Sequence, residues 1–325
     1  MFIGVDIGGT KVAAGLVDAG GNIRSRVRVP MVSNSSAQHG LDAVLAAINS
    51  VLQKTEAEIA GVGVCAPGPL DPRTGIILNP PNLPCWRNFA LADAVRSACR
   101  VETKIDNDAN AAALAEARWG AAKGYGIVFY ATLGTGIGTG IVFDAKIYHG
   151  RTGAAGEGGH VSIDHRGPKC ACGKPGCIEA LASGTAIARR AREKAFSGQP
   201  SSLVHLARGR IESITAETVG QAAREGDPVA RQILDETIEL LALWLGNIID
   251  LLDPGIVVIG GGASALLVPF LEHLRELLPR FSLNPRANEV PVVSARYGAD
   301  AGIAGGAALC AALPSGTPAQ SEKDR

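Results

Sequence analysis

The chain has 325 residues, enough for two lobes of ordinary domain size. Hydrophobic residues make up 46% of it and charged residues 19%, a globular composition that excludes disorder for most of the chain. Lys and Arg total 31, as do Asp and Glu, so the formal net charge of zero gives no argument for nucleic acid or an anionic membrane as a partner.

The N-terminus begins a strand pattern at once, in MFIGVDIGGT, and we therefore expect no signal sequence. The most apolar window, residues 238–262, is interrupted by Glu239, Asn247 and Asp250. It predicts a buried helix followed by a strand, and no membrane span. Seven cysteines without a secretory signal indicate reduced thiols and a cytoplasmic protein.

The first third of the chain alternates strand and helix patterns. Residues 2–29 predict a β-hairpin or meander, because the apolar runs FIGVDIG and KVAAGLVD are followed by the turn AGGN. Residues 40–55 have helical spacing, and IAGVGVCAP is typical of a buried strand. Residues 65–90, rich in Pro and Asn, predict a long loop. VETKIDND then predicts a strand and a loop, and ANAAALAEARWG a helix that ends at Gly120.

The opening pattern recurs further along the chain. Residues 7–18, IGGTKVAAGLVD, align with residues 133–144, LGTGIGTGIVFD, so that Gly8 meets Gly134 and Asp18 meets Asp144. Both stretches predict strand, Gly-rich turn and strand. This repeat indicates two lobes with similar cores that face one another.

The remaining segments continue the alternation. Residues 184–195 and 228–252 predict helices, and DPGIVVIGGG (253–262) predicts a strand that runs into three glycines. VVSARYG predicts another strand, and DAGIAGGAALCAAL a last helix of small residues. Strands that alternate with helices after each hairpin favour an α/β fold.

Two glycine-rich loops follow strands, DIGGTK (6–11) and GTGIGTG (134–140). Glycine lets backbone N–H groups approach anionic oxygens, and Thr10 and Thr135 can add hydroxyl donors. The alternative is a pair of tight hairpin turns, but one loop in each predicted lobe favours phosphate binding. Neither loop is a Walker A motif, and neither matches the Rossmann fingerprint, because a strand follows each of them.

Residues beside these loops suit other parts of a nucleotide. Asp6 ends the first strand, and a carboxylate beside a phosphate loop suits Mg²⁺ or its waters. The glycines at 260–262 end another strand, where a nucleobase or ribose can lie against bare backbone. A plain helix-start turn is the alternative for these glycines.

The sequence DNDAN (106–110) precedes the Ala-rich helix. Helix capping alone explains one of these polar residues. Moving a phosphoryl group onto an alcohol needs a carboxylate that takes the hydroxyl proton and an amide that orients the alcohol. We predict Asp108 as the base and Asn107 as the orienting group, with Asp106 as the rival base.

Three cysteines, Cys170, Cys172 and Cys177, follow His160. A Cys₃His set fills the tetrahedron of Zn²⁺, so a metal here would be structural. His165 is the competing ligand, and we prefer His160 because it lies in GEGGH. Glu157 and Glu179 flank the loop, and two carboxylates held around a closed zinc site suit recognition of vicinal hydroxyls.

Together these motifs resemble the ROK family of bacterial sugar kinases and repressors, which belongs to the actin-like ATPase superfamily with hexokinase. The resemblance runs from Phe2 to about Leu313 and includes DIGGTK, GVGVCAPGPLD, NPPNLPCW, DNDANAAALAE, TLGTGIGTGIV, GEGGH and CxCGxxGCxE. It implies a two-lobed, ribonuclease H-like fold with ATP and sugar in the cleft. Repressor members carry a helix-turn-helix before the first phosphate loop, and here that loop starts at residue 6.

The resemblance implies a lobe assignment and a role for each matching residue. The small lobe would contain residues 1–115 and the helix 300–314, the large lobe residues 116–299, and residues 315–325 would be a disordered tail. The catalytic base would be Asp108. The sugar would be bound by Gly68, Asn82, Asn107, Asp108, Glu157, His160 and Glu179. The nucleotide would be bound by Asp6, Gly9, Thr10, Lys11, Thr135, Gly136, Gly260 and Gly261. Structural Zn²⁺ would be held by His160, Cys170, Cys172 and Cys177.

The motifs NPPNLPCW and GEGGH look most like the glucokinase branch, so the resemblance implies ATP- and Mg²⁺-dependent phosphorylation of the glucose 6-hydroxyl. Kinases for N-acetylglucosamine and N-acetylmannosamine share nearly all of these motifs, and a non-catalytic sugar sensor is the other alternative. Cys85 and Pro69 depart from common family patterns on the sugar loop and bear on specificity. The family implies a homodimer, and the sequence leaves the anomer and the phosphate donor, ATP or polyphosphate, open.

Overall fold

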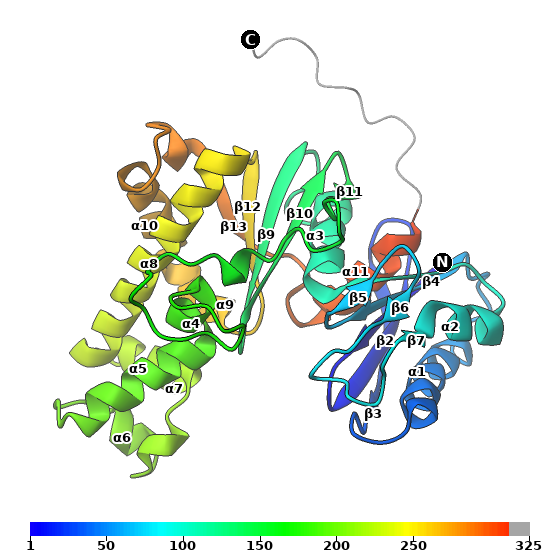
Figure 1. Cartoon of the computed structure of the whole chain (residues 1–325), viewed down its shortest axis with the longest axis horizontal. Coiled ribbons are helices and arrows are strands. Elements are labelled where there is room, and N and C mark those ends of the chain that lie inside the picture. The colour runs from blue at the N-terminus through cyan, green and yellow to red at the C-terminus, as the bar shows by residue number, and fades with distance from the viewer. Residues whose placement is uncertain (312–325) are drawn as a thin grey trace.

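The computed structural model describes residues 1–311 and contains two five-stranded mixed sheets (Figure 1). The strands of the first sheet lie in the order β3-β2-β1-β4-β8 and those of the second in the order β11-β10-β9-β12-β13. The first sheet comprises β1 (Phe2–Ile7), β2 (Lys11–Val17), β3 (Ile23–Pro30), β4 (Gly61–Ala66) and β8 (Thr103–Asn107). The second comprises β9 (Ile127–Leu133), β10 (Ile137–Phe143), β11 (Lys146–Ile147), β12 (Ile256–Gly260) and β13 (Val292–Ser294).

The two sheets confirm the predicted repeat. In each, an antiparallel hairpin is followed by two parallel strands, because β1 pairs with β4 and β9 with β12 in parallel. The turn of the first hairpin is closed by the Gly8 N–H, which donates to the Lys11 carbonyl at 2.9 Å. In the second, the Gly134 N–H donates to the Gly136 carbonyl at 2.9 Å. Each predicted phosphate loop therefore contains the turn between the first two strands of its sheet, although residues 137–140 of the second loop belong to strand β10.

Helices occur in the first lobe, which is built on the first sheet, and between the two sheets. They lie within a few residues of the predicted helices, except for the helix Leu91–Cys99, which the sequence pattern did not predict. They are α1 (Ala37–Leu52), α2 (Leu91–Cys99), α3 (Asp108–Trp119) and α11 (Ala301–Cys310). The second lobe adds α4 (Ile178–Ala182), α5 (Gly184–Phe196), α6 (Leu203–Leu206), α7 (Ala216–Arg224), α8 (Pro228–Leu252), α9 (Ser264–Leu267) and α10 (Leu271–Leu277). Among these described helices, none is both long and apolar enough to cross a bilayer.

Two predictions of local structure were wrong. The stretch 65–90 is not a plain loop, because it contains the small sheet of β5 (Leu70–Asp71), β6 (Ile76–Ile77) and β7 (Phe89–Ala90). Strands of two residues are too short to show a period in the sequence. The strand predicted over VVSARYG ends at Ser294, and the rest of that stretch forms a turn that leads into α11.

Helix α11 packs its backbone directly against the first sheet. A Cβ atom on Gly4 of β1 would overlap the Ile303 carbonyl oxygen, and one on Gly63 of β4 would overlap that of Gly306. On its other side, Gly305 abuts the backbone of Ala111 in α3. Helix α3 in turn packs against β9 and β10. The two helices therefore join the sheets at the centre of the molecule (Figure 1).

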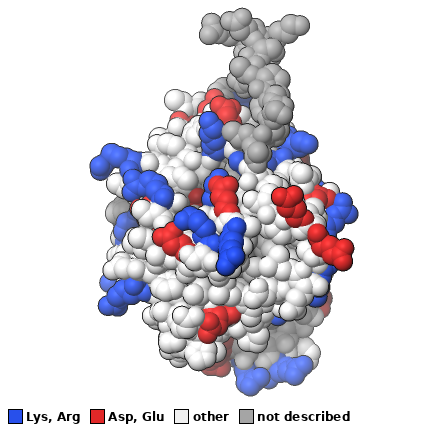
Figure 2. Space-filling view, turned by 90° about the vertical axis from the view of Figure 1, so that its right-hand side faces the viewer, with Lys and Arg blue, Asp and Glu red and all other residues white. Residues whose placement is uncertain are grey.

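The lobe boundaries stay a prediction. The predicted division between residues 115 and 116 lies inside α3, which contacts both α11 and the second sheet. The last residues of the predicted helix 300–314 and the predicted tail 315–325 lie outside the described residues. On the described part of the face in Figure 2, basic and acidic side chains are interspersed, in keeping with the balanced composition.

Gly63→Ala tests the close contact between α11 and the first sheet. The added methyl group would overlap the Gly306 carbonyl oxygen, and overpacking of this kind lowers the free energy of unfolding by about 1–3 kcal/mol or more. Urea denaturation measures the loss. Gly262→Ala is the matched control, because a Cβ there meets no atom within 4 Å. Equal stability of the two variants would contradict the packing argument.

Candidate active site

A cavity of about 170 Å³ lies between the two sheets, at the point where α3 and α11 begin. Its walls come from β1, from α3, from β9 and from the turn before α11. They are formed by Asp6, Asp108, Ala109, Ala112, Tyr130, Thr132, Gly298, Ala299, Ala301 and Gly302. The cavity thus brings together the two carboxylates that the sequence assigned to a metal and to a base.

The two carboxylates of the cavity disfavour each other's charge. Burial, and then the nearby Asp108, raise the pKa of Asp6 to about 6, although Lys11 opposes this rise. Burial also raises the pKa of Asp108, and the charge of Glu157 adds to the effect. Two acidic groups that share a cavity without a full counter-charge suit a divalent cation or a proton acceptor.

Asn107 caps helix α3 and also contacts Asp108, which lines the cavity. Its Oδ1 accepts from the Ala109 N–H at 2.9 Å and from the Asn110 N–H at 3.3 Å, so it is the N-cap of α3. The side chain of Asn107 also hydrogen-bonds Asp108, which lowers the pKa of that carboxyl. Its Nδ2 lies 3.9 Å from the Cβ position of Gly68. Both interpretations of this asparagine, cap and orienting amide, are therefore compatible with its position.

Asp106, the rival base, is engaged elsewhere. Its Oδ1 accepts from the Asn107 N–H at 2.8 Å and from Asn110 Nδ2 at 3.2 Å, and its Oδ2 lies 2.6 Å from His149 Nε2. The residue is only 3% exposed and lines a different cavity from Asp108. Asp108, and not Asp106, therefore shares a cavity with Asp6.

The first phosphate loop adjoins the stretch NPPNLPCW. The Cβ position of Gly9 lies 3.1 Å from the Asn82 carbonyl oxygen, and the Thr10 carbonyl accepts from the Met31 N–H at 2.9 Å. The side chains of Thr10, Lys11 and Asn82 are exposed at this edge of the first sheet. The predicted phosphate and sugar residues of the first lobe therefore lie side by side.

A second cavity, of about 500 Å³, begins at Gly134 and Thr135 of the second phosphate loop. Its remaining walls come from the ends of α5, α7 and β12, namely Gly184, Thr185, Ala188, Arg192, Thr215, Ala216, Glu217, Gly262 and Ala263. Of the three glycines at 260–262, only Gly262 lines it. A Cβ at Gly260 would overlap the Tyr130 hydroxyl and one at Gly261 the Leu133 carbonyl, so these two glycines serve close packing.

Sequence reasoning missed most walls of this second cavity. The clearest available signal was the Ala-Ser-Gly that follows Glu179 and Ala180-Leu181, because Ser183 caps α5 beside the loop. The Gly184 N–H donates to the Gly134 carbonyl at 2.8 Å, and the Thr185 hydroxyl donates to the Thr135 carbonyl at 2.8 Å. The start of α5 therefore fixes the second phosphate loop.

Glu157 lies on a segment that Thr139 of β10 holds in place. The Thr139 hydroxyl donates to the Gly156 carbonyl and accepts from the Gly158 N–H at 2.7 Å. One hydroxyl thus fixes the residues on both sides of Glu157, whose side chain is exposed. Thr139 is buried and was assigned no role from the sequence.

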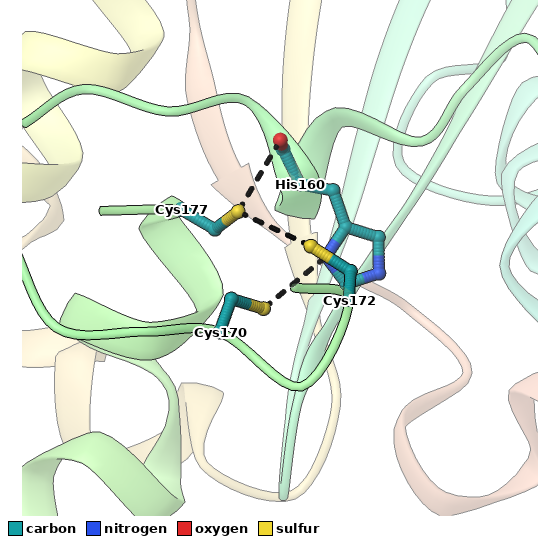
Figure 3. Close-up of side chains that lie close together, drawn as sticks. All are labelled: His160, Cys170, Cys172 and Cys177. Atoms are coloured by element: carbon teal, nitrogen blue, oxygen red, sulfur yellow. Dashed lines mark hydrogen bonds between the residues drawn. The ribbon is translucent and has the colours of Figure 1, made fainter. Parts of the chain in front are cut away.

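The side chains of four potential metal ligands converge (Figure 3). The ligand atoms of His160, Cys170, Cys172 and Cys177 all lie within 4.8 Å of one another. Cys172 Sγ lies 3.6 Å from Cys177 Sγ, and Cys170 Sγ lies 3.6 Å from His160 Nδ1. Ligands around tetrahedral Zn²⁺, with bonds of about 2.0–2.3 Å, lie roughly 3.3–3.8 Å apart, so the cluster fits such an ion. His165 is exposed and is not part of the cluster.

Glu179 connects this Cys₃His cluster to the phosphate loop. Its Oε2 accepts from the Ile137 N–H at 2.9 Å, and a Cβ on Gly136 would displace this oxygen. Its Oε1 lies 3.9 Å from His160 Nδ1 and 3.7 Å from Cys170 Sγ. The carboxylate therefore fixes the end of the loop and faces the cluster.

The molecule has two sheets of the same topology, joined by two central helices, with a pair of carboxylates between them. This architecture is that of two-lobed kinases with the actin-like ATPase fold. The fold is shared with a solved ROK family glucokinase from Streptomyces griseus in complex with glucose and AMPPNP, which covers 95% of this chain and 98% of that one with a TM-score of 0.81 and 36% identity. The ROK family model matches residues 2–312, and the chain belongs to that family.

Curated relatives agree with this assignment. A glucokinase of Thermotoga maritima is 37% identical over 310 residues, 95% of this chain and 96% of the relative. An N-acetylmannosamine kinase of Shigella boydii is 34% identical over 309 residues, 94% of this chain and 97% of the relative. The sequence-based predictions of the family and of the two-lobed fold are confirmed.

Asp6→Asn should stabilise the protein at pH 7.5, because it removes a charge that burial disfavours. Asp6 has a folded pKa of about 6, above the usual value of about 3.9. Its protonated form therefore favours the folded state: this stabilisation is complete below about pH 3.9 and is lost as the pH rises through about 6. We expect a melting temperature about 2–4 °C above wild type at pH 7.5, and a smaller difference at pH 5. Differential scanning fluorimetry measures both differences.

The exposed carboxylate of Asp42 on α1 offers a control, Asp42→Asn, which should shift neither melting temperature by more than about 1 °C. A difference between Asp6→Asn and wild type that is the same at pH 5 and pH 7.5 would contradict the raised pKa of Asp6.

Proposed function

We propose that the protein is an ATP-dependent hexose kinase that phosphorylates the 6-hydroxyl of glucose. The position of Asp108 carries this proposal. It is a buried carboxylate with a raised pKa, in a cavity that adjoins both sheets, within electrostatic reach of Glu157 and beside Asp6. The S. griseus glucokinase, solved with glucose and AMPPNP, shares 36% identity across 95% of this chain and supports the choice of both substrates.

In the proposed reaction Asp108 accepts the proton of the sugar 6-hydroxyl. The freed oxygen attacks the γ-phosphorus of ATP, the bond from that phosphorus to the β,γ-bridging oxygen breaks, and ADP leaves. Asn107 Nδ2 would orient the hydroxyl next to Gly68. Because burial raises the pKa of Asp108 above the usual carboxyl range, it is a stronger base than an exposed aspartate.

The sugar hydroxyls would be held from both lobes. Asn82 and Gly68 would contribute from the first lobe, and Glu157, His160 and Glu179 from the second. Thr139 supports this arrangement, because its hydroxyl fixes both neighbours of Glu157. Closure of the lobes around the sugar would exclude water, which otherwise competes as phosphoryl acceptor.

The nucleotide would span both phosphate loops. Gly9, Thr10 and Lys11 would bind phosphate from the first lobe, and Thr135 and Gly136 from the second. The 500 Å³ cavity between α5, α7 and Gly262 is large enough for adenosine. Of the three glycines at 260–262, we place the nucleoside against Gly262, in preference to Gly260 and Gly261, the two that the family resemblance implies.

Two metal ions complete the proposal. Asp6 would hold Mg²⁺ or its waters, and the mutual charge repulsion of Asp6 and Asp108 fits a cation at that place. Bound Mg²⁺ would neutralise charge on the phosphates. His160, Cys170, Cys172 and Cys177 would hold structural Zn²⁺, which would fix His160 and the segment that carries Glu179.

We further propose a homodimer in the cytoplasm. All seven cysteines are free thiols, in keeping with a reducing compartment. Light scattering coupled to size-exclusion chromatography measures the oligomeric state.

A coupled ADP-release assay tests the proposed activity. The panel contains glucose, mannose, fructose, N-acetylglucosamine, N-acetylmannosamine and no sugar, with ATP and polyphosphate as donors. Turnover with glucose well above the acetylated sugars is the expected result. Preference for an N-acetyl sugar would replace glucose with an amino sugar as substrate, and absence of sugar-dependent turnover would favour a sugar sensor.

Asp108→Asn should lower kcat for glucose by about 10²–10⁴-fold, because the amide accepts no proton from the 6-hydroxyl. Glucose binding, measured by calorimetry, should persist, and the melting temperature should not fall. Asp42→Asn on the exposed face of α1 is again the control and should keep wild-type kcat. A variant at residue 108 that retains most of its turnover would refute the base assignment.

Removing the cluster metal should lower stability and sugar affinity together. Cys172 is the exposed ligand, so Cys172→Ser removes a thiolate without leaving a buried hole. We expect loss of bound zinc by mass spectrometry, a lower melting temperature and weaker glucose binding. Cys99→Ser, on α2 and outside the cluster, is the control. Metal-free protein with unchanged glucose affinity would disprove the supporting role of the cluster.

A further inference from the structure

His149 makes a contact between the two lobes that the proposed chemistry does not use. It follows β11 of the second sheet, and its Nε2 lies 2.6 Å from Oδ2 of Asp106, at the end of β8 in the first sheet. The His149 side chain is 32% exposed and that of Asp106 is 5% exposed. The histidine therefore reaches from an accessible position to a carboxylate that is almost fully buried.

On the first-lobe side, Asp106 fixes the turn that carries the proposed base. Its other oxygen accepts from the Asn107 N–H at 2.8 Å and from Asn110 Nδ2 at 3.2 Å. Asn107 caps α3, whose first residue is Asp108. A shift of the Asp106 carboxylate would therefore change the backbone just before Asp108.

On the second-lobe side, His149 begins the segment that ends at Glu157. The His149 carbonyl accepts from the Ala155 N–H at 3.2 Å. The Cβ position of Gly156 lies 3.4 Å from Asn110 Oδ1, so this segment also touches the start of α3. Thr139 then fixes Gly156 and Gly158 around Glu157. One short segment thus contains both the contact to Asp106 and a proposed sugar ligand.

We propose that His149 is a positioning residue which, through Asp106, holds the Glu157 segment (149–157) in register with the Asp108 turn (106–108). The inference rests on the proposed sugar kinase activity, since it assigns to His149 the alignment of the sugar-binding segment with the base. His149 touches neither substrate and acts through Asp106.

The surroundings of His149 make this contact sensitive to pH. The hydrogen bond to Asp106 raises the pKa of His149, the charges of Asp106 and Asp71 act in the same direction, and partial burial opposes them. The residue lines a cavity of about 500 Å³ that is open to solvent protons. The other charged groups that line this cavity are Arg73, Arg96, Glu102, Lys104, Arg118 and Lys146.

The sign of the pH effect follows from the raised pKa. The charged form of His149 strengthens its contact with Asp106. This stabilisation is complete below the ordinary histidine pKa of about 6.5, and it is lost as the pH rises through the higher pKa of the folded protein. Sugar affinity should therefore weaken on the alkaline side of 6.5, in a step that requires a histidine at this position.

Two substitutions separate positioning from mere stability. Gln places an amide N–H close to where the Nε2–H of histidine lies, and it does not titrate. His149→Phe removes the donor and leaves Oδ2 of Asp106 without this hydrogen bond. We expect His149→Phe to raise the glucose KM about tenfold or more, with the ATP KM within twofold of wild type. His149→Gln should restore the glucose KM to within about threefold at pH 8 and should abolish its alkaline step.

His273 offers matched controls, because its Nδ1 pairs with Glu276 at 3.7 Å on an exposed face of α10. His273→Phe and His273→Gln should leave both KM values and the pH profile unchanged. Hydrogen–deuterium exchange of the sugar-free proteins gives a readout that needs no turnover. Exchange should rise in both 103–110 and 149–158 in His149→Phe, and not in His149→Gln.

These outcomes decide between the inference and the proposed function. Wild-type protein that turns over no sugar would overturn the function, and the exchange experiment would still decide the inter-lobe contact. A His149→Phe variant with wild-type glucose KM, or with increased exchange in only one of the two segments, would overturn the positioning role. An alkaline step that survives in His149→Gln would assign the pH effect to another group.

Discussion

The structure depends on the direct contact between the backbone of α11 and the strands β1 and β4. Glycines on both sides, Gly4 and Gly63 in the strands and Gly306 in the helix, allow an approach that any side chain would prevent. Because α11 also abuts α3 through Gly305, the starts of the two helices lie together beside the end of β1. That arrangement places Asp6 and Asp108, which are far apart in the sequence, in a single cavity.

The cavity works against the stability of the fold that creates it. Packing that excludes water raises the pKa of both carboxyl groups, so each negative charge at neutral pH is held at a cost. A protein optimised for stability alone would replace at least one of them. Conflicts of this kind are typical of catalytic sites, and the proposed reaction uses both charges, one on the base and one beside the metal ion.

The sequence allowed the parts built from contiguous residues to be predicted. The duplicated hairpin, the Asp108 turn and the Cys₃His cluster each lie within a short stretch, where spacing alone indicates geometry. The parts assembled from distant segments could not be predicted. Helices α5 and α7 meet Gly262 around the larger cavity only after folding, and nothing near His149 in sequence indicates that Asp106 is its partner. Two-residue strands such as β5 were missed because they show no period.

Glu179 constrains how this protein could evolve toward other sugars. One of its oxygens accepts from the Ile137 N–H of the proposed second phosphate loop, while the other faces the Cys₃His cluster. With the sugar role proposed for Glu179, a substitution there would alter phosphate binding along with hydroxyl recognition. The stretch around Asn82 and Cys85 is held by its backbone: the Asn82 carbonyl lies against Gly9, and the Cys85 N–H donates to the Ser33 carbonyl. The Asn82 side chain is exposed, so it could change without altering these contacts. Changes in substrate preference would therefore be expected in the stretch around Asn82 and Cys85, while Glu179 stays unchanged.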